Sequence, residues 1–69
     1  MQIDTIDRWH EVARQLSERG YSLFQTQYDI DDPKGFVARF MVNESEKVPQ
    51  VELVTRSAVV RDAMLRYKL

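Results

Sequence analysis

The one histidine of the chain is the first candidate for chemistry. His10 lies in a segment that we expect to be helical, near the acidic residues Asp7 and Glu11. A histidine that acts as a general base needs an orienting partner and a substrate pocket, and this spacing predicts neither of them. We therefore expect His10 to be a partly exposed structural residue.

The acidic stretch Asp29-Ile30-Asp31-Asp32 is the second candidate, because carboxylates bind hard cations. Its spacing is similar to the start of a calcium-binding EF-hand loop, but Pro33 interrupts it and the distant bidentate glutamate is missing. A solvated hairpin loop is the simpler interpretation. The chain also has no cysteine, which excludes thiolate metal sites and a cysteine nucleophile. We expect no metal ion and no cofactor.

The hydroxyl side chains lack the surroundings of a nucleophile. The sequence contains no glycine-rich phosphate loop, no G-x-S-x-G and no H-E-x-x-H motif. A chain of 69 residues also has little room for a substrate pocket beside its own core. The sequence therefore predicts that the protein is not an enzyme.

Length and charge indicate one small domain spanning residues 1–69 with no overall preference for polyanions. The net charge is −1, and hydrophobic and charged residues make up 43% and 30% of the chain. Residues 29–52 hold twice as many acids as bases, whereas residues 53–69 are mostly basic. Such an asymmetry either steers a partner or is neutralised within the fold.

The N-terminal stretch is acidic and has no apolar run, so we expect no signal peptide. No segment approaches the roughly 20 apolar residues of a membrane span. With the lack of cysteine, these features favour a cytoplasmic protein.

Hydrophobic spacing predicts a first helix from about residue 6, because its apolar residues fall within one arc of a helical wheel. Asp4 or Thr5 can cap its start, and Gly20 can end it in the left-handed conformation. The residues of the apolar arc are Ile6, Trp9, Val12, Ala13 and Leu16.

Period-two alternation then predicts strands over residues 21–30, 36–42 and 51–55. The first two strands are joined by a hairpin loop in which Gly35 permits a positive φ. A polar turn at residues 43–47 and Pro49 precede the third strand, where Val51 and Leu53 face inward. In the first strand the alternation puts Phe24, Thr26, Tyr28 and Ile30 on one face, and Leu23, Gln25 and Gln27 on the other.

A last helix, capped by Thr55 or Ser57, is predicted to run to about Tyr67. The chain should therefore fold as α-β-β-β-α, an α+β domain with a three-stranded antiparallel meander and both helices on one face. This order resembles that of the double-stranded-RNA-binding domain in topology only. The basic cluster that opens the last helix of that family is replaced here by Thr55-Arg56-Ser57-Ala58-Val59-Val60.

Two surfaces are candidate partner interfaces. The last helix carries a second apolar stripe with Leu65 and Leu69, flanked by Arg61 and Lys68, and the outer face of the sheet carries Arg39 and Met41. We expect a small soluble interaction or adaptor module, self-associating as a dimer through this helix or a sheet edge, or binding another protein. The alternative is a nucleic-acid-associated protein that contacts phosphates through Arg56, Arg61, Arg66 and Lys68.

Overall fold

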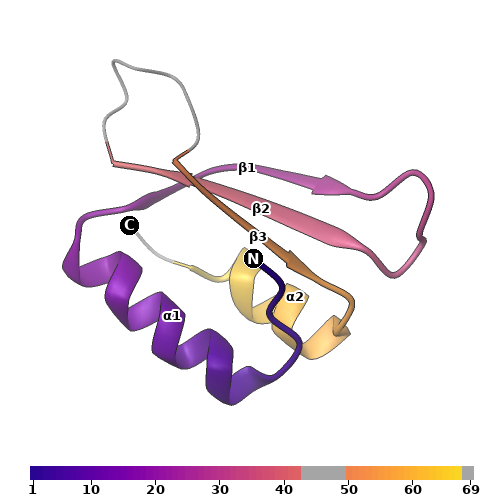
Figure 1. Cartoon of the computed structure of the whole chain (residues 1–69), viewed down its shortest axis with the longest axis horizontal. Helices are drawn as coiled ribbons and strands as arrows, with labels where there is room; N and C mark the ends of the chain where they lie inside the picture. The colour runs from indigo at the N-terminus through magenta and orange to yellow at the C-terminus, as the bar shows by residue number, and fades with distance from the viewer. Residues whose placement is uncertain (43–49, 68–69) are drawn as a thin grey trace.

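The computed structural model describes residues 1–42 and 50–67, and it has the predicted α+β architecture. Its elements are α1 (Ile6–Glu18), β1 (Ser22–Tyr28), β2 (Phe36–Met41), β3 (Val51–Thr55) and α2 (Ala58–Leu65). The strands form one antiparallel sheet in the order β1-β2-β3, and both helices lie on the same face of it (Figure 1). The turn predicted at 43–47 and Pro49 lie outside the described residues.

The caps of both helices come from residues that the sequence singled out. The Thr5 hydroxyl accepts a hydrogen bond from the Arg8 N–H at 3.3 Å, and the Ser57 hydroxyl accepts one from Val60 N–H at 3.3 Å. Gly20 follows α1 with φ of +76°, a conformation that strains any residue with a side chain. The last helix ends at Leu65, two residues before its predicted end.

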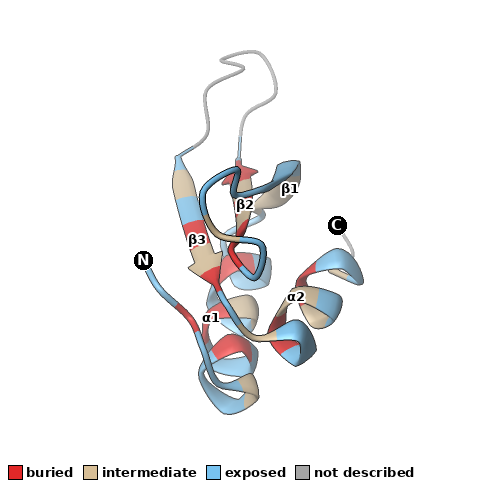
Figure 2. Cartoon of the chain, turned by 90° about the vertical axis from the view of Figure 1, so that its right-hand side faces the viewer, coloured by how far each residue is buried: buried red, intermediate tan, exposed pale blue. Residues whose placement is uncertain are grey.

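The core lies between the sheet and the helices. Figure 2 shows the buried positions on the inner sides of the elements. At its centre the Phe40 ring lies 6.3 Å from Trp9 and 5.2 Å from Tyr67, measured between ring centroids. Leu23 of β1 is partly buried against this cluster. The buried members come from the other elements and the N-terminal segment, and they are Ile3, Trp9, Val12, Leu16, Phe36, Ala38, Phe40, Leu53, Val60 and Met64.

A register shift in β1 corrects the predicted faces of that strand. Leu23 pairs with Phe40 and Gln25 pairs with Arg39, so Phe24 is an extra residue in the ladder. Because one inserted residue reverses the alternation, Leu23 lies on the core face of the sheet. The prediction that Leu23 shares a face with Gln25 and Gln27 is therefore wrong.

The N-terminal segment joins the sheet, which the sequence pattern did not predict. Ile3 N–H donates to the Val54 carbonyl at 2.8 Å, and Val54 N–H donates to the Met1 carbonyl at 2.8 Å. This short pairing runs parallel to β3. The Ile3 side chain is fully buried in the core, so residues 1–3 cover the outer edge of β3.

The hairpin loop between β1 and β2 needs Gly35 for a reason other than the predicted one. Gly35 has no positive φ. A Cβ atom at this position would lie 2.8 Å from the Cβ of Asp29, which is too close for two carbon atoms. The loop closes tightly because Asp29 N–H donates to the Gly35 carbonyl at 3.0 Å and Gly35 N–H donates to the Asp32 carbonyl at 2.8 Å.

Candidate functional site: the open edge of the sheet

The outer edge of β1 is the edge of the sheet that no other segment covers within residues 1–42 and 50–67. β1 pairs with β2 on one side, and no described strand pairs with its other side. In Figure 1 this strand runs along the border of the sheet, opposite β3 and the N-terminal segment. An uncovered edge strand presents backbone donors and acceptors to any chain that approaches it.

The ladder indicates which backbone groups point outward. Asp29 N–H donates to the Gly35 carbonyl, so Asp29 directs its N–H toward the β2 side of the hairpin. Residues of an antiparallel strand direct their N–H and C=O groups alternately to the two sides. Gln27 therefore bonds toward β2, while Thr26 and Tyr28 direct their backbone groups to the uncovered side.

The composition of β1 does little to discourage pairing. Its sequence, SLFQTQY, has no charged residue and no proline, the devices that commonly protect an edge. Apolar side chains are exposed along and just beyond it: Phe24 is 41%, Tyr28 55% and Ile30 92% accessible to solvent. The irregularity at Phe24 is the one protective feature of the strand itself.

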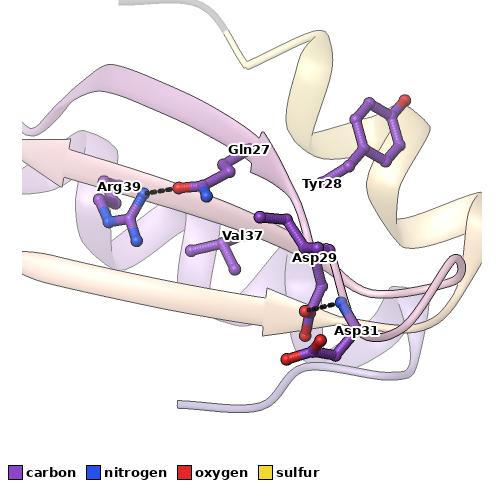
Figure 3. A pocket seen from close by; sticks show the side chains of 7 residues that line it. Gln27, Tyr28, Asp29, Asp31, Val37 and Arg39 are labelled. Carbon is purple, nitrogen blue, oxygen red and sulfur yellow. Dashed lines mark hydrogen bonds between the residues drawn. The ribbon is translucent and has the colours of Figure 1, made fainter.

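A shallow depression of about 280 Å³ adjoins the end of this edge (Figure 3). Within it the Arg39 guanidinium donates to the Gln27 side chain at 3.0 Å and to the Glu52 carboxylate at 2.9 Å. The depression thus combines a polar rim with an apolar wall, and it could receive one side chain of a segment lying along β1. Its lining residues are Gln27, Tyr28, Asp29, Ile30, Asp31, Val37 and Arg39.

The candidate residues of the last helix lie partly at the surface. Leu65 is 48% exposed and points away from the core, as its position on the helical wheel predicts. The Arg61 guanidinium is engaged by the neighbouring Asp62 carboxylate at 3.2 Å. Lys68 and Leu69 lie outside the described residues. A role of this helix in binding stays a prediction.

The outer sheet face differs from the expected surface at Met41. Only 6% of Met41 is accessible, so the expectation that it contributes exposed apolar surface is wrong. Arg39 is at the outer face but bonds Gln27 and Glu52 across the strands. The apolar surface that is exposed lies instead along β1, at residues that the sequence analysis assigned only to a strand.

The residues considered for catalysis and for nucleic acid are dispersed. His10 is exposed on α1, and no three histidine, aspartate or glutamate side chains in the described part are grouped to hold a metal ion. Of the basic residues proposed to contact phosphates, Arg56 pairs with Asp32 at 2.8 Å and Arg61 pairs with Asp62. None of the helices in the described ranges is long and apolar enough to cross a membrane.

Comparison with protein-family models, with curated proteins and with solved structures found no match for this chain. The fold and the site define it as a small α+β protein with an antiparallel sheet, one edge of which is uncovered within the described residues. The lack of charge in β1 is visible in the sequence, but which edge is covered depends on where residues 1–3 lie.

Proposed function

We propose that this protein is a small cytoplasmic interaction module, not an enzyme, which binds an extended protein segment by strand addition along β1. The observation that carries this proposal is the uncharged edge of β1, with the backbone groups of Thr26 and Tyr28 directed outward. In strand addition, main-chain hydrogen bonds supply affinity and pockets for alternate side chains supply specificity. The depression beside Tyr28 can serve as such a pocket.

The exposed side chains at the end of β1 support the same location. Tyr28 packs edge-on against Phe36 with ring centroids 5.3 Å apart, which holds its ring in place while half of it remains exposed. Fixed aromatic surface loses little entropy when a partner covers it, and aromatic residues are enriched in interfaces. Ile30 extends this apolar surface into the hairpin loop.

The last helix is the weaker candidate for the principal interface. It offers exposed apolar side chains at Val59 and Leu65, but its backbone groups are bonded within the helix except at its ends. Single exposed apolar residues are common on protein surfaces. The open strand offers both kinds of interaction, since apolar side chains and outward backbone groups lie along the same edge.

A peptide selection tests the proposal without knowledge of the natural partner. The protein would be presented with a displayed library of ten-residue extended peptides, and binding of selected peptides would be compared between wild type and Thr26→Pro. Proline removes an outward N–H and places a ring in the path of an added strand, while the β1–β2 ladder keeps its bonds. We expect at least a tenfold loss of affinity in Thr26→Pro.

Two matched variants control this experiment. Thr26→Val keeps the N–H and should bind as wild type does, and Leu65→Asp alters the helix and should also leave binding unchanged. Far-ultraviolet circular dichroism would confirm that Thr26→Pro is folded. Selection of no peptide by monomeric protein, or loss of binding in Leu65→Asp with retention in Thr26→Pro, would contradict the proposal.

A further inference from the structure

We infer that the segment bound along β1 is β1 of a second copy of this chain, paired antiparallel about a two-fold axis so that both sheets become one. This inference rests on the proposed function and adds the identity and the direction of the bound strand. Two-fold dimers are the commonest protein assemblies, and their interface must be complementary to itself. The charges along and around β1 meet that requirement.

The strand can pair with itself because it carries no charge. Self-pairing places identical strands side by side, and like charges on facing positions destabilise a sheet. β1 has none, whereas β2 carries Arg39 and β3 carries Glu52. β1 is therefore the strand best suited to pair with its own copy.

The region around the start of β1 is basic. The Tyr67 hydroxyl donates to the Tyr21 carbonyl at 2.9 Å, so the segment that follows α2 reaches the residue that precedes β1. Arg66 is the neighbour of Tyr67 in this segment. Arg19 immediately precedes the strand in the chain. Neither Arg19 nor Arg66 makes an ion pair with a described residue, and Glu18 is the one acid adjacent to Arg19 in sequence.

The region at the end of β1 is acidic. Asp29 and Asp31 follow the strand directly, and neither carboxylate makes an ion pair within the described ranges. Lys34 is the nearest base in the loop, while the charge of Asp32 is matched by Arg56 at 2.8 Å. Each copy thus has a basic group of residues at one end of β1 and an acidic group at the other.

These charges select the antiparallel direction. Antiparallel pairing brings the acidic end of each strand to the basic end of its partner. The two-fold axis repeats this contact at both ends of the paired strands. Parallel pairing would bring acids to acids and bases to bases. Complementary charge across an interface fixes its register and excludes wrong arrangements. Phe24, Tyr28 and Ile30, which are exposed in one copy, would lie in or beside the shared sheet.

Single-cysteine variants test the arrangement directly, because the natural chain has no cysteine. Thr26 lies near the middle of β1, so two Thr26→Cys chains would place their cysteines at a facing position. The Cα atoms of facing antiparallel residues are roughly 4.5–5.5 Å apart, within the range that a disulfide bridges. We expect Thr26→Cys to form a covalent dimer under mild oxidation.

Two other cysteine variants separate this arrangement from its alternatives. Ser22→Cys lies at the start of β1, so antiparallel pairing keeps the two cysteines far apart and parallel pairing brings them together. Leu65→Cys would be bridged if the last helices met instead. Efficient bridging of Ser22→Cys or of Leu65→Cys, with none at Thr26→Cys, would overturn the inference.

Charge reversal tests the orientation in the uncrosslinked protein. In sedimentation equilibrium we expect Asp31→Arg and Arg19→Asp each to raise the dimer dissociation constant by roughly threefold to tenfold, and the double variant to restore it. If the dissociation constant of the double variant is raised by the product of the two single effects, the antiparallel arrangement is overturned. A wild type that stays monomeric but still binds selected peptides would overturn the second copy as partner and leave the proposed function intact.

Discussion

The two edges of the sheet are treated in opposite ways. At the β3 edge, residues 1–3 add backbone hydrogen bonds to Val54, and the Ile3 side chain is completely buried. At the β1 edge no described segment adds such bonds, and the side chains of Phe24 and Tyr28 remain exposed. The same small core therefore supports one closed edge and one open edge.

The difference shows that the β3 edge is covered because the backbone of residues 1–3 bonds to it and the Ile3 side chain packs in the core. Ile3 reaches the core and so holds the N-terminal segment against β3. Ile30, two residues beyond the end of β1 at the other edge, is 92% exposed. Asp4 strengthens the closed side, since its carboxylate accepts the Arg56 N–H at 3.1 Å. An edge left open while its counterpart is bonded is a reason to look for a partner there.

The largest effect should come from removing the side chain that closes the β3 edge. We expect Ile3→Ala to lower the free energy of unfolding by about 2–5 kcal/mol, because it leaves a cavity where a fully buried residue packs. Ile30→Ala is the matched control and should change it by less than about 0.5 kcal/mol. Urea unfolding at low protein concentration measures both, and equal costs would contradict the contrast between the edges.

A smaller effect is expected from the carboxylate that ties residues 1–4 to the start of α2. Asp4 Oδ1 accepts the Arg56 N–H at 3.1 Å and lies 3.5 Å from the hydroxyl of Thr55, which is buried. Asp4→Ala should lower the free energy of unfolding by about 1–2 kcal/mol. Asp31→Ala removes a carboxylate at the open edge and serves as the control. A loss in Asp31→Ala as large as that in Asp4→Ala would refute this assignment.

The start of β1 is held by a side-chain contact, and a third prediction tests it. Tyr67→Phe removes the hydrogen bond to the Tyr21 carbonyl and should lower the free energy of unfolding by about 1 kcal/mol. The hydroxyl of the exposed Tyr28 makes no such bond to a residue within 1–42 or 50–67, so Tyr28→Phe should be nearly neutral. Thermal unfolding of the two variants at neutral pH gives the comparison.

The same tyrosine predicts a pH dependence. Burial raises the pKa of Tyr67 above its ordinary value of 10.0, so the hydroxyl loses its proton more readily in the unfolded chain. Its contribution to stability is therefore present below pH 10 and falls as the pH rises through the raised pKa. The stability difference between wild type and Tyr67→Phe should shrink above about pH 10. A difference that stays constant to higher pH would show that this proton is not involved.

The smallest effect is expected on the outer face, where Arg39 links β1 to β3 through Gln27 and Glu52. Glu52→Gln should lower the free energy of unfolding by less than about 1 kcal/mol, because the Glu52 side chain is half exposed and the pair is screened by salt. Repeating the thermal unfolding of wild type and variant at 1 M salt should narrow their difference. A larger difference at high salt would mean that the pair acts through packing.

The alternation of apolar residues was sufficient to predict most elements. Phe36, Ala38 and Phe40 alternate without interruption, and the strand they predict is buried on the expected face. The pattern failed in β1, where Phe24 is inserted into the ladder and reverses the face of Leu23. The alternation of apolar and polar residues does not reveal an inserted residue. Its position is decided by pairing with the neighbouring strand and not by local preference.

The candidate surface was less predictable than the fold. Leu65 is exposed as the helical wheel predicts, but Met41 is buried, and the open edge was not among the predicted residues. Whether a strand edge is exposed depends on where the other segments of the chain lie. The sequence shows that β1 has no charge, yet it does not show that residues 1–3 pair with β3 instead.

What the sequence alone determined was the order of helices and strands, a pair of candidate residues for each helix cap and the inward faces of β2 and β3, because these follow from periodicity and local hydrogen bonding. Tertiary structure alone decided the insertion at Phe24 and the pairing of Ile3 beside Val54, and this pairing decides which edge of the sheet is covered. The physical reason is that an edge is covered by contacts between segments distant in the chain. Those contacts depend on which side chain reaches the shared core.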